Sequence, residues 1–235
     1  MKTLRTTRLA TPPSLNAVRA SADLAHSIQT PLAILKSELF FLRQEIPENS
    51  RARVCDKLID DIATSLRGFL DLSRLDQSLQ TKTFQYFSLS ELCEDTLESL
   101  ETLAEANGVH LQFRITPDLS MHGLPEKIRD LLIQLVGNSI SYIGHGKKEM
   151  YVILSRRHSA GTLTIEDTGI GIPKKDLMHI CEPFYRGKNV IERGMAGTGL
   201  GLSTAKRIVD IHRGKMSIES VVGKGTRVTL RIPLA

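Results

Sequence analysis

The sequence contains no tryptophan, only three cysteines, and an aromatic fraction of 5%. The cysteines, Cys55, Cys93 and Cys181, lie far apart and form no CxxC pair, which argues against a disulfide framework or a zinc site. No stretch reaches the roughly 18 apolar residues of a membrane span, and the amino terminus lacks the apolar core of a secretory signal. We therefore expect a cytoplasmic chain, or the cytoplasmic part of an inner-membrane protein whose span is absent from this chain.

A strong excess of one charge is also missing. In 235 residues, 31 basic side chains stand against 26 acidic ones, so we expect no nucleic-acid partner. An apolar fraction of 41% is ordinary for a globular protein, and the length suggests one or two domains. The basic residues Lys2, Arg5, Arg8 and Arg19 precede the first acid. They belong either to a solvated terminus, flexible over residues 1–13, or to a segment beside the cytoplasmic face of a membrane.

Residues 14–77 carry apolar side chains at helical spacing. One stripe comprises Leu24, Ile28, Leu32, Leu35, Leu39, Leu42 and Ile46, and a second comprises Val54, Leu58, Ile62, Leu66, Phe69 and Leu72. Residues 47–50 (PENS) separate the stripes, and proline breaks a helix. The pattern predicts an antiparallel helical hairpin. Because a lone hairpin buries little apolar surface, we expect a homodimer in which two hairpins form a four-helix bundle.

Residues 84–235 mix helical and strand patterns, after a polar hinge at 78–83. Ser88 and Glu91 form a capping box that opens a helix, and Gly108 ends this helix. The periodicity predicts further helices at 125–143 and 204–212, the latter closed by Gly214, and strands at 109–115, 150–154, 162–166, 215–220 and 226–232. The predicted fold is thus a helical hairpin followed by an α/β sandwich, with helices on one face of a mixed sheet.

Three glycine-bearing segments follow one another in this second part: IEDTGIGIP at 165–173, EPFYRG at 182–187 and GTGLGL at 197–202. Asp167 ends a strand and can accept a hydrogen bond from an exocyclic amine, while Gly169 and Gly171 let the backbone approach a flat ring. The glycines of the third segment precede a helix, whose exposed N–H groups suit phosphates. Arg186 is a candidate phosphate clamp. Each segment alone fits an ordinary turn, but the three in this order predict a nucleotide cleft.

The segments resemble the G1, F and G2 boxes of the catalytic ATP-binding domain of the sensor histidine kinases of two-component systems, an α/β sandwich of the Bergerat (GHKL) type. LVGNSISY at 135–142 resembles the N box of that domain. ADLAHSIQTPLA at 22–33 resembles the H box of the HisKA dimerisation and phosphotransfer domain and is similar to that of PhoQ-type kinases. LDLSRLD at 70–76 resembles the end of the second helix of that domain. The resemblance covers nearly the whole chain from residue 20 onward.

This resemblance implies an ATP-dependent protein histidine kinase with ATP and Mg²⁺ as cofactors. It makes His26 the phosphoacceptor, and a receiver-domain aspartate of a response regulator the next acceptor. It makes Asn138 the Mg²⁺ ligand. The implied nucleotide contacts are Asn138, Tyr142, Asp167, Gly169, Gly171, Ile172, Phe184, Tyr185, Arg186, Lys188, Gly197, Thr198, Gly199, Leu200, Gly201, Leu202 and Thr226.

The helical pattern itself also distinguishes His26. It lies two residues from both Leu24 and Ile28, which places it about 200° around the helix from each. His26 therefore points away from the apolar stripe and toward solvent. Pro31 cannot donate a hydrogen bond to the Ser27 carbonyl, so the helix should bend there. Such a bend would change the exposure of the imidazole when the bundle rotates.

Ser27 and Thr30, which both follow His26, affect the kinase and phosphatase activities that the H box would support. Ser27 stands where the family usually has an acid that acts as a base, so autophosphorylation must be assisted differently. Thr30 matches the family and could orient a water molecule, so the resemblance also allows a phosphatase activity toward the regulator.

The cleft departs from the family at two positions. Ser141 replaces a lysine that reaches the phosphates, and Lys188 or Arg193 could substitute for it. Gln134 stands where gyrase-type ATPases have a catalytic glutamate, and an amide cannot act as a general base. Two alternatives stay open. One is a phosphotransfer or docking module with a degenerate cleft, which Ser141 favours and the intact Asp167 opposes; the other is an ATPase of the gyrase and Hsp90 type, which Gln134 opposes.

Overall fold

The computed structural model describes residues 33–37, 39–41, 55, 58–60, 62–63, 66, 83–144, 146–193, 195 and 197–235. The contacts divide the chain into two units, Met1–Gln80 and Thr81–Ala235, and each is treated by itself. The predicted phosphoacceptor His26, its neighbours Ser27 and Thr30, and the segment 70–76 lie outside the described residues. Within the described part of the chain, no helix combines the length and the hydropathy that a membrane crossing requires.

The described residues of the first unit are all helical. The Lys36 ammonium pairs with the Asp60 carboxylate at 2.5 Å, which joins two helical segments that are 24 residues apart in the chain. Three residues of the predicted apolar stripes, Leu35, Leu58 and Ile62, remain about half exposed in the single chain. The two segments therefore contact one another and leave apolar side chains uncovered.

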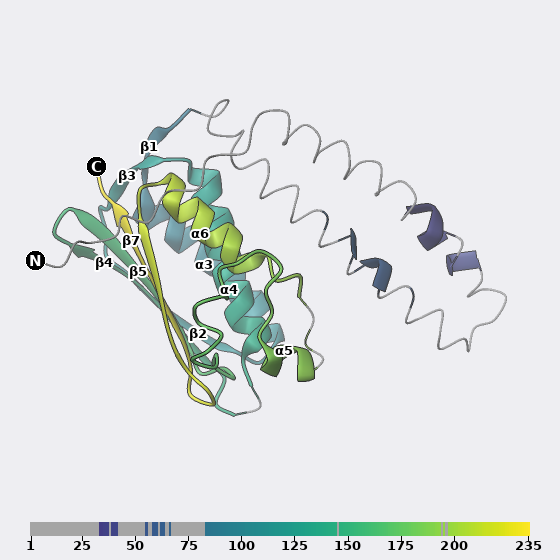
Figure 1. Ribbon diagram of the computed structural model, residues 1–235. Coiled ribbons are helices and arrows are strands. Elements are labelled where there is room, and N and C mark those ends of the chain that lie inside the picture. Colours follow the sequence, from purple (N-terminus) through teal and green to yellow (C-terminus); the bar gives the residue numbers. More distant parts are fainter. Residues whose placement is uncertain are drawn as a thin grey trace, which may run out of the picture. The chain divides into compact units, whose positions relative to one another are not determined.

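The second unit is built on a five-stranded sheet with the order β2-β4-β5-β7-β6 (Figure 1). Its strands are β2 (His110–Ile115), β4 (Glu149–Arg157), β5 (Ala160–Asp167), β6 (Lys215–Val221) and β7 (Gly225–Pro233). β2 and β4 are parallel, and every other neighbouring pair is antiparallel. A separate antiparallel pair joins β1 (Gln85–Ser88) to β3 (Ser120–Gly123). The predicted mixed sheet is thus confirmed.

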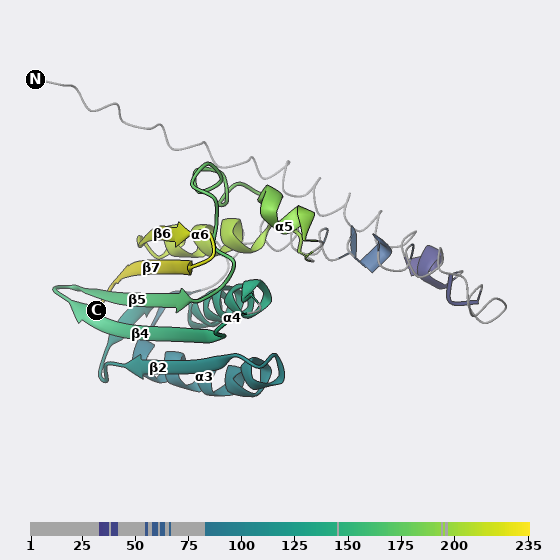
Figure 2. The same cartoon turned by 90° about the horizontal axis from the view of Figure 1, so that it is seen from below.

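Three helices cover one face of this sheet: α3 (Leu89–Ala106), α4 (Pro125–Tyr142) and α6 (Gly201–Ile211). Figure 2 shows α3 beside β2 and α6 toward the opposite edge of the sheet, with α4 between them. The strands bury every second side chain, as Met150, Val152 and Leu154 do on β4. This alternation confirms the prediction of a sandwich with its helices on one face.

The start and end of α3 follow the sequence prediction. The Ser88 hydroxyl accepts a hydrogen bond from the Glu91 N–H at 3.2 Å, so Ser88 is the predicted N-cap of this helix. Gly108 adopts φ +69°, and its N–H donates to the Glu105 carbonyl at 2.8 Å. This left-handed residue ends the helix in the geometry that glycine favours.

The end of α6 corrects the sequence prediction. The left-handed residue is Arg213, at φ 55°, and not Gly214. α6 ends at Ile211, so its capping motif requires the left-handed conformation one position before the glycine. The N–H of Gly214 then donates to the Val209 carbonyl at 2.9 Å. α6 also begins at Gly201 and not at residue 204, because the last glycine of GTGLGL is already helical.

Three short elements were absent from the prediction: β1, β3 and α5 (Lys188–Glu192). β1 and β3 have four residues each, and α5 has five. Such lengths are too short for hydrophobic periodicity to reveal them. β1 and β3 form because they pair with each other, although α3 and β2 separate them in the sequence.

His212 fastens the end of α6 to the turn before α4. Its Nε2 accepts the Leu124 N–H at 2.9 Å, so the imidazole is neutral and its Nδ1–H donates to the Ile208 carbonyl at 2.8 Å. The side chain is 5% exposed, and the Phe84 ring lies 5.4 Å from it, centroid to centroid. Burial lowers the pKa of His212 below its ordinary value of 6.5.

We expect His212→Ala to lower the free energy of unfolding at pH 7.5 by about 2–4 kcal/mol, because it leaves a cavity and an unsatisfied Leu124 N–H. The pKa of His212 is lowered in the folded state, so its stabilising contribution is complete above pH 6.5 and is lost as pH falls through the folded value. Urea unfolding at pH 7.5 and 5.5 should therefore show a smaller acid-induced loss in the variant than in the wild type. His122→Ala, at an exposed ring beside the same Phe84, is the control and should leave both quantities nearly unchanged.

Candidate functional site

Asp167, the last residue of β5, carries a buried carboxylate at the end of the sheet. Its Oδ1 accepts the N–H groups of Gly169 at 2.8 Å and Thr226 at 3.2 Å. Its Oδ2 accepts the Ser139 hydroxyl at 3.1 Å. The carboxylate thus connects the loop after β5 with β7 and α4. Because each carboxylate oxygen can accept two hydrogen bonds, Oδ2 keeps one position open.

Burial raises the pKa of Asp167, and the hydrogen bonds from Gly169, Ser139 and Thr226 offset this rise only in part. The protein therefore keeps a carboxylate where desolvation disfavours its charge. A buried acid of this kind, held in place by three donors, is typical of a group that recognises a ligand. What it offers is a fixed acceptor for a donor such as an amine.

One face of α4 borders the start of α6. Gln134, Asn138 and Tyr142 are spaced by four residues and share this face, and Gln134 Nε2 donates to Asn138 Oδ1 at 3.2 Å. A Cβ added at Gly201 would lie 2.6 Å from Gln134 Nε2 and 3.1 Å from Asn138 Nδ2. A Cβ added at Gly197 would lie 3.1 Å from the Tyr142 hydroxyl oxygen. The glycines therefore let the chain approach these polar side chains closely.

The amino terminus of α6 is available to an anion. Its N-cap, Leu200, supplies no capping side chain, and the Leu200 N–H donates to Thr198 Oγ1 at 3.3 Å. Leu200 is buried and Leu202 is half-buried, so both side chains pack beneath the turn. The N–H groups of a first helical turn have no partner within the helix and lie at the positive end of its dipole. Gly201, the first residue of α6, lies beside the Asn138 side chain, since a Cβ added there would be 3.1 Å from Asn138 Nδ2.

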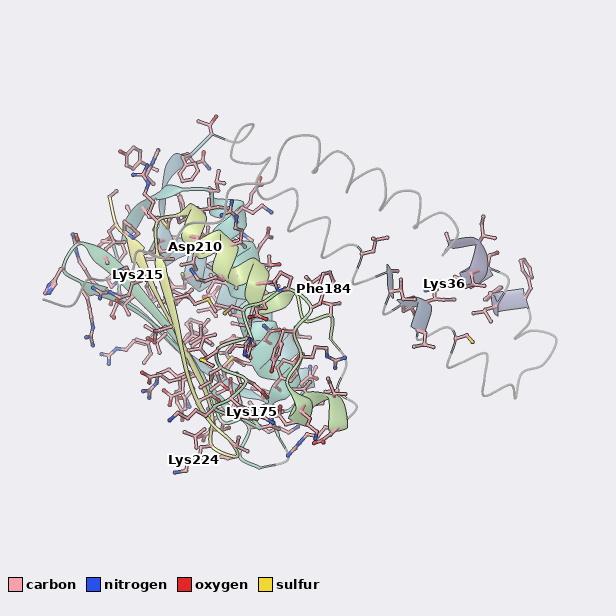
Figure 3. All side chains as sticks on the ribbon, viewed as in Figure 1. Lys36, Lys175, Phe184, Asp210, Lys215 and Lys224 are labelled. Atoms are coloured by element: carbon pink, nitrogen blue, oxygen red, sulfur yellow. The ribbon has the colours of Figure 1, made fainter. Side chains whose placement is uncertain are left out.

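Phe184 connects the F segment to the start of α6. Its N–H donates to the Gly199 carbonyl at 3.0 Å, and its own φ is 66°. Figure 3 shows Phe184 on the side of the helices away from the sheet, where half of the residue is exposed. Gly199 has φ +73°, and a Cβ there would lie 2.6 Å from the Phe184 carbonyl carbon. Only glycine fits this position without moving the backbone.

We expect Gly199→Ala to lower the free energy of unfolding of the second unit by about 2–4 kcal/mol, because it combines a left-handed conformation with a backbone clash. Gly137→Ala is the matched control. Its added Cβ meets nothing within 4 Å, and alanine should stabilise the interior of α4 by about 0.5–1 kcal/mol. Urea unfolding of both variants measures the difference; equal stabilities would contradict the packing of Gly199 against Phe184.

Two of the cations that were predicted to reach the phosphates, Arg186 and Lys188, have partners within the segment 182–200, which we call the lid. The Arg186 guanidinium donates to the Met195 carbonyl. The Lys188 ammonium lies 3.6 Å from the Glu192 carboxylate on α5. Both cations therefore have partners inside the lid, and either would have to leave its partner to reach a ligand.

The β6–β7 hairpin completes the site on the side of the first glycine segment. Ser220 Oγ accepts the Ile172 N–H at 2.8 Å and lies 2.8 Å from the Gly225 carbonyl oxygen and 2.9 Å from Thr226 Oγ1. The Gly223 N–H donates to the Ile170 carbonyl at 2.9 Å. The loop after β5 is thus fixed to the same hairpin that supplies the Thr226 N–H to Asp167.

The structure gathers the predicted residues into three groups. In the first group, the N–H groups of Gly169 and Thr226 donate to the Asp167 carboxylate. In the second, Asn138 and Tyr142 border the segment from Gly197 to Gly201. In the third, Phe184 donates to Gly199, and the neighbouring Tyr185 donates to Asp176 at 3.0 Å. Gly171 and Ile172 lie in the loop that the hairpin holds.

Sequence reasoning missed Ser139 and Ser220. Ser139 directly follows Asn138 in the N box, so its place beside the predicted helix face was a usable signal. Ser220 has no local signal, because its contacts with residues 172 and 226 depend on the register of β6 against β7.

Comparison with known proteins finds a family match within the second unit. Residues 123–235 match the family described as histidine kinase-, DNA gyrase B-, and HSP90-like ATPases. The chain is 31% identical over 226 residues to sensor histidine kinase AruS of Pseudomonas aeruginosa, covering 92% of this chain and 22% of AruS. It is 30% identical over 220 residues to sensor histidine kinase RppB of Synechocystis, and the match covers 91% of this chain and 48% of RppB. It is 28% identical over 218 residues to sporulation kinase B of Bacillus subtilis, and that match covers 91% of this chain and 49% of the kinase. The chain thus spans half or less of the length of these relatives.

Solved structures share the fold. Full-length ShkA in complex with AMPPNP matches with a TM-score of 0.71 and 19% identity over 96% of this chain and 46% of that one. The catalytic domain of histidine kinase ThkA matches with a TM-score of 0.55 and 26% identity, covering 64% of this chain and 95% of that domain.

Proposed function

We propose that this chain, which is similar over most of its length to sensor histidine kinases, is an ATP-dependent protein histidine kinase that phosphorylates its own His26. In this proposal the phosphoryl group then passes to an aspartate of a response regulator. The observation that carries the proposal is the buried Asp167 carboxylate with one open acceptor position, in a unit that also offers the bare amino terminus of α6. The first recognises a base and the second a phosphate chain.

The purine end of ATP fits Asp167. Both positions of Oδ1 are taken by backbone N–H groups, whereas Oδ2 accepts only the Ser139 hydroxyl. An exocyclic amine can therefore donate to Oδ2 without displacing any bond of the protein. A purine with a carbonyl oxygen at position 6 would instead place that acceptor against Asp167 Oδ2, which is also an acceptor. The site therefore favours adenine over guanine. A relative of the same fold, ShkA, was solved with AMPPNP, which supports an adenine nucleotide here.

The phosphate end fits the start of α6 and Asn138. The described residues contain no group of three or more His, Cys, Asp or Glu side chains that could hold a metal. Mg²⁺ nevertheless fits, because it prefers oxygen ligands and usually takes few from the protein and the others from phosphates and water. Asn138 Oδ1 would be the protein ligand, and it accepts one hydrogen bond, from Gln134 Nε2, which leaves a lone pair for the metal ion. When bound, Mg²⁺ would neutralise phosphate charge.

The phosphoacceptor step concerns His26, which lies outside the described residues. A ring nitrogen of His26 would form a bond to the γ-phosphorus as the bond to the β–γ bridging oxygen breaks, so that ADP leaves and the imidazole N–H proton passes to solvent. Positioning supplies most of the catalysis in such transfers, because the transition state is loose. The lid would provide charge through Arg186 or Lys188, since Ser141 cannot.

The proposal includes a homodimer in which residues 14–77 of two chains form a four-helix bundle, with 84–235 as the catalytic domain. The half-exposed Leu35, Leu58 and Ile62 support a partner for the helical unit, because isolated amphipathic hairpins leave such side chains uncovered. A receiver domain would dock on this helical unit near His26, and Thr30 would orient water in a phosphatase reaction. We further propose a cytoplasmic location, where ATP and response regulators are found.

Incubation of the full chain with γ-labelled ATP and Mg²⁺ tests the proposal. We expect protein-bound label that acid removes and base does not, as is typical of a phosphoramidate. Nucleotide binding without label would support a phosphotransfer or docking module instead. Release of labelled phosphate without protein-bound label would support an ATPase of the gyrase and Hsp90 type.

A further inference from the structure

Asp176 is a buried acid that the proposed reaction does not use. It lies between the loop after β5 and the lid, and only 4% of the residue is exposed. Its Oδ1 accepts the Tyr185 hydroxyl at 3.0 Å, and this hydrogen bond is the largest cause of a raised pKa of Tyr185. Its backbone carbonyl accepts the N–H groups of His179 and Ile180, so the main chain around Asp176 is fixed.

The second carboxylate oxygen, Asp176 Oδ2, is fully buried and has no hydrogen-bond partner. A Cβ added at Gly187 would lie 3.1 Å from this oxygen, so Oδ2 faces the lid backbone. Buried carboxylate oxygens are almost always hydrogen-bonded, because an unpaired one loses its water without replacement. Asp176 Oδ2 can therefore accept a hydrogen bond from a donor that the lid around Gly187 would supply.

Arg186 lies between the two lid residues that Asp176 faces, Tyr185 and Gly187. Its guanidinium donates to the Met195 carbonyl, but its Nε is also buried and without a partner. One unpartnered polar group, Arg186 Nε, thus lies in the lid, and the other, Asp176 Oδ2, faces Gly187, the residue that follows Arg186. Asn189, two residues beyond Gly187, fixes the other side of the segment through its Nδ2, which donates to the Gly171 carbonyl at 3.0 Å.

We propose that Asp176 is a positioning residue that holds the lid backbone on both sides of Arg186 and so directs this arginine to the terminal phosphate of ATP. The inference rests on the proposed function. Oδ1 holds Tyr185 before the arginine, and Oδ2 takes a donor from the lid around Gly187 after it when nucleotide is bound. Arg186 then exchanges the Met195 carbonyl for the phosphate. Asp176 would thereby favour binding of ATP over ADP while touching neither nucleotide.

The test compares the affinities of the full chain for ADP and for a non-hydrolysable ATP analogue, each with Mg²⁺, by titration calorimetry. We expect Asp176→Asn to weaken binding of the ATP analogue roughly five- to tenfold and to leave ADP within about twofold, because a bond to a charged group is lost only in the lid-closed state. Asp210→Asn is the matched control. Asp210 lies near the far end of α6 and pairs with Lys206 on the surface, so neither affinity should change (Figure 3).

A merely structural Asp176 predicts a different result. Asparagine has the same shape and removes an unpaired buried charge, so the variant would then be equally or more heat-stable and would keep the wild-type ratio of the two affinities. Tyr185→Phe provides a second variant that removes only the Oδ1 bond, and it should shift the ratio in the same direction. Unchanged ratios in both variants would overturn the inference.

A double-variant cycle separates Asp176 from Arg186. Arg186→Ala should weaken the ATP analogue more than ADP, and adding Asp176→Asn to it should cause little further loss, because Asp176 acts through the arginine. Additive losses would contradict the proposed coupling. If the wild-type chain binds neither nucleotide, the proposed function fails together with this inference; if it binds both and only the ratios stay constant, the inference alone fails.

Discussion

A His26→Gln variant is expected to take up no acid-labile, base-stable label from γ-labelled ATP and Mg²⁺. Glutamine resembles imidazole in size and polarity but has no nucleophilic ring nitrogen, so the phosphoramidate bond cannot form. The affinity for ATP should stay within about twofold of the wild type, since His26 belongs to the first unit and the implied nucleotide contacts all belong to the second. Label is followed by gel autoradiography after acid and base treatment, and affinity by calorimetry.

His110→Gln serves as the matched control for this experiment. His110 is an exposed histidine at the start of β2, on the sheet of the second unit, and the variant should label like the wild type. Persistent label in His26→Gln would show that another side chain accepts the phosphoryl group. Loss of label in both variants would point to a general loss of activity and would remove the support for His26.

The second large effect is expected at Asp167. Asp167→Asn should weaken ATP binding roughly 10- to 100-fold, because hydrogen bonds to charged groups contribute about 1.5–3 kcal/mol each and the amide also directs a donor at the adenine amine. Asparagine keeps an acceptor for Gly169 and Thr226, so the backbone around the site is retained. Calorimetric titration with ATP measures the change.

The same variant should not lose stability. Burial raises the folded-state pKa of Asp167, so its stabilising contribution is complete below the unfolded pKa, for which 3.8 is the ordinary value, and is lost as pH rises through the folded value. At pH 7 the charged carboxylate therefore costs stability, and the amide removes that cost. Urea unfolding at pH 7 should show a free energy of unfolding equal to or above that of the wild type.

Glu166→Gln is the control for Asp167. Glu166 precedes it on β5, so its side chain points to the opposite face of the sheet, where Oε2 pairs with Arg227 at 2.8 Å. This variant should bind ATP like the wild type. If Asp167→Asn also binds ATP with wild-type affinity, the base-recognition site lies elsewhere.

Sequence patterns within a few residues made the main helices and strands of the second unit predictable. The N-cap at Ser88, the left-handed Gly108 and the alternation along β4 and β5 each depend on neighbours within a few residues, and the structure confirms all of them. The order of the three glycine segments predicted that their residues would share a site. Asp167 and Gly169, both of the first segment, lie together because the loop after β5 turns back onto the Asp167 carboxylate, and Phe184 of the second segment donates to Gly199 of the third.

Features that depend on distant pairing were not predictable. Ser220 reaches Ile172 only because β6 pairs with β7 in one register, and nothing near either residue in the sequence encodes that contact. Arg213 adopts the left-handed position because α6 ends at Ile211, one residue before the expected end. The buried Asp176 was equally invisible, since an isolated acid between two lysines and a leucine predicts a surface turn.

The fixed carboxylate of Asp167 and the lid, in which Arg186 would have to leave Met195, give the two ends of the site different roles in small-molecule binding. Three donors from separate elements already orient the carboxylate, so a fragment-sized heterocycle with one amine can bind there without ordering any further segment. Such a compound need not disturb the bond between Arg186 and Met195. The Asp167 carboxylate is therefore the efficient starting point for an inhibitor. A compound that is extended from there toward α6 would also have to order the lid, which costs binding free energy.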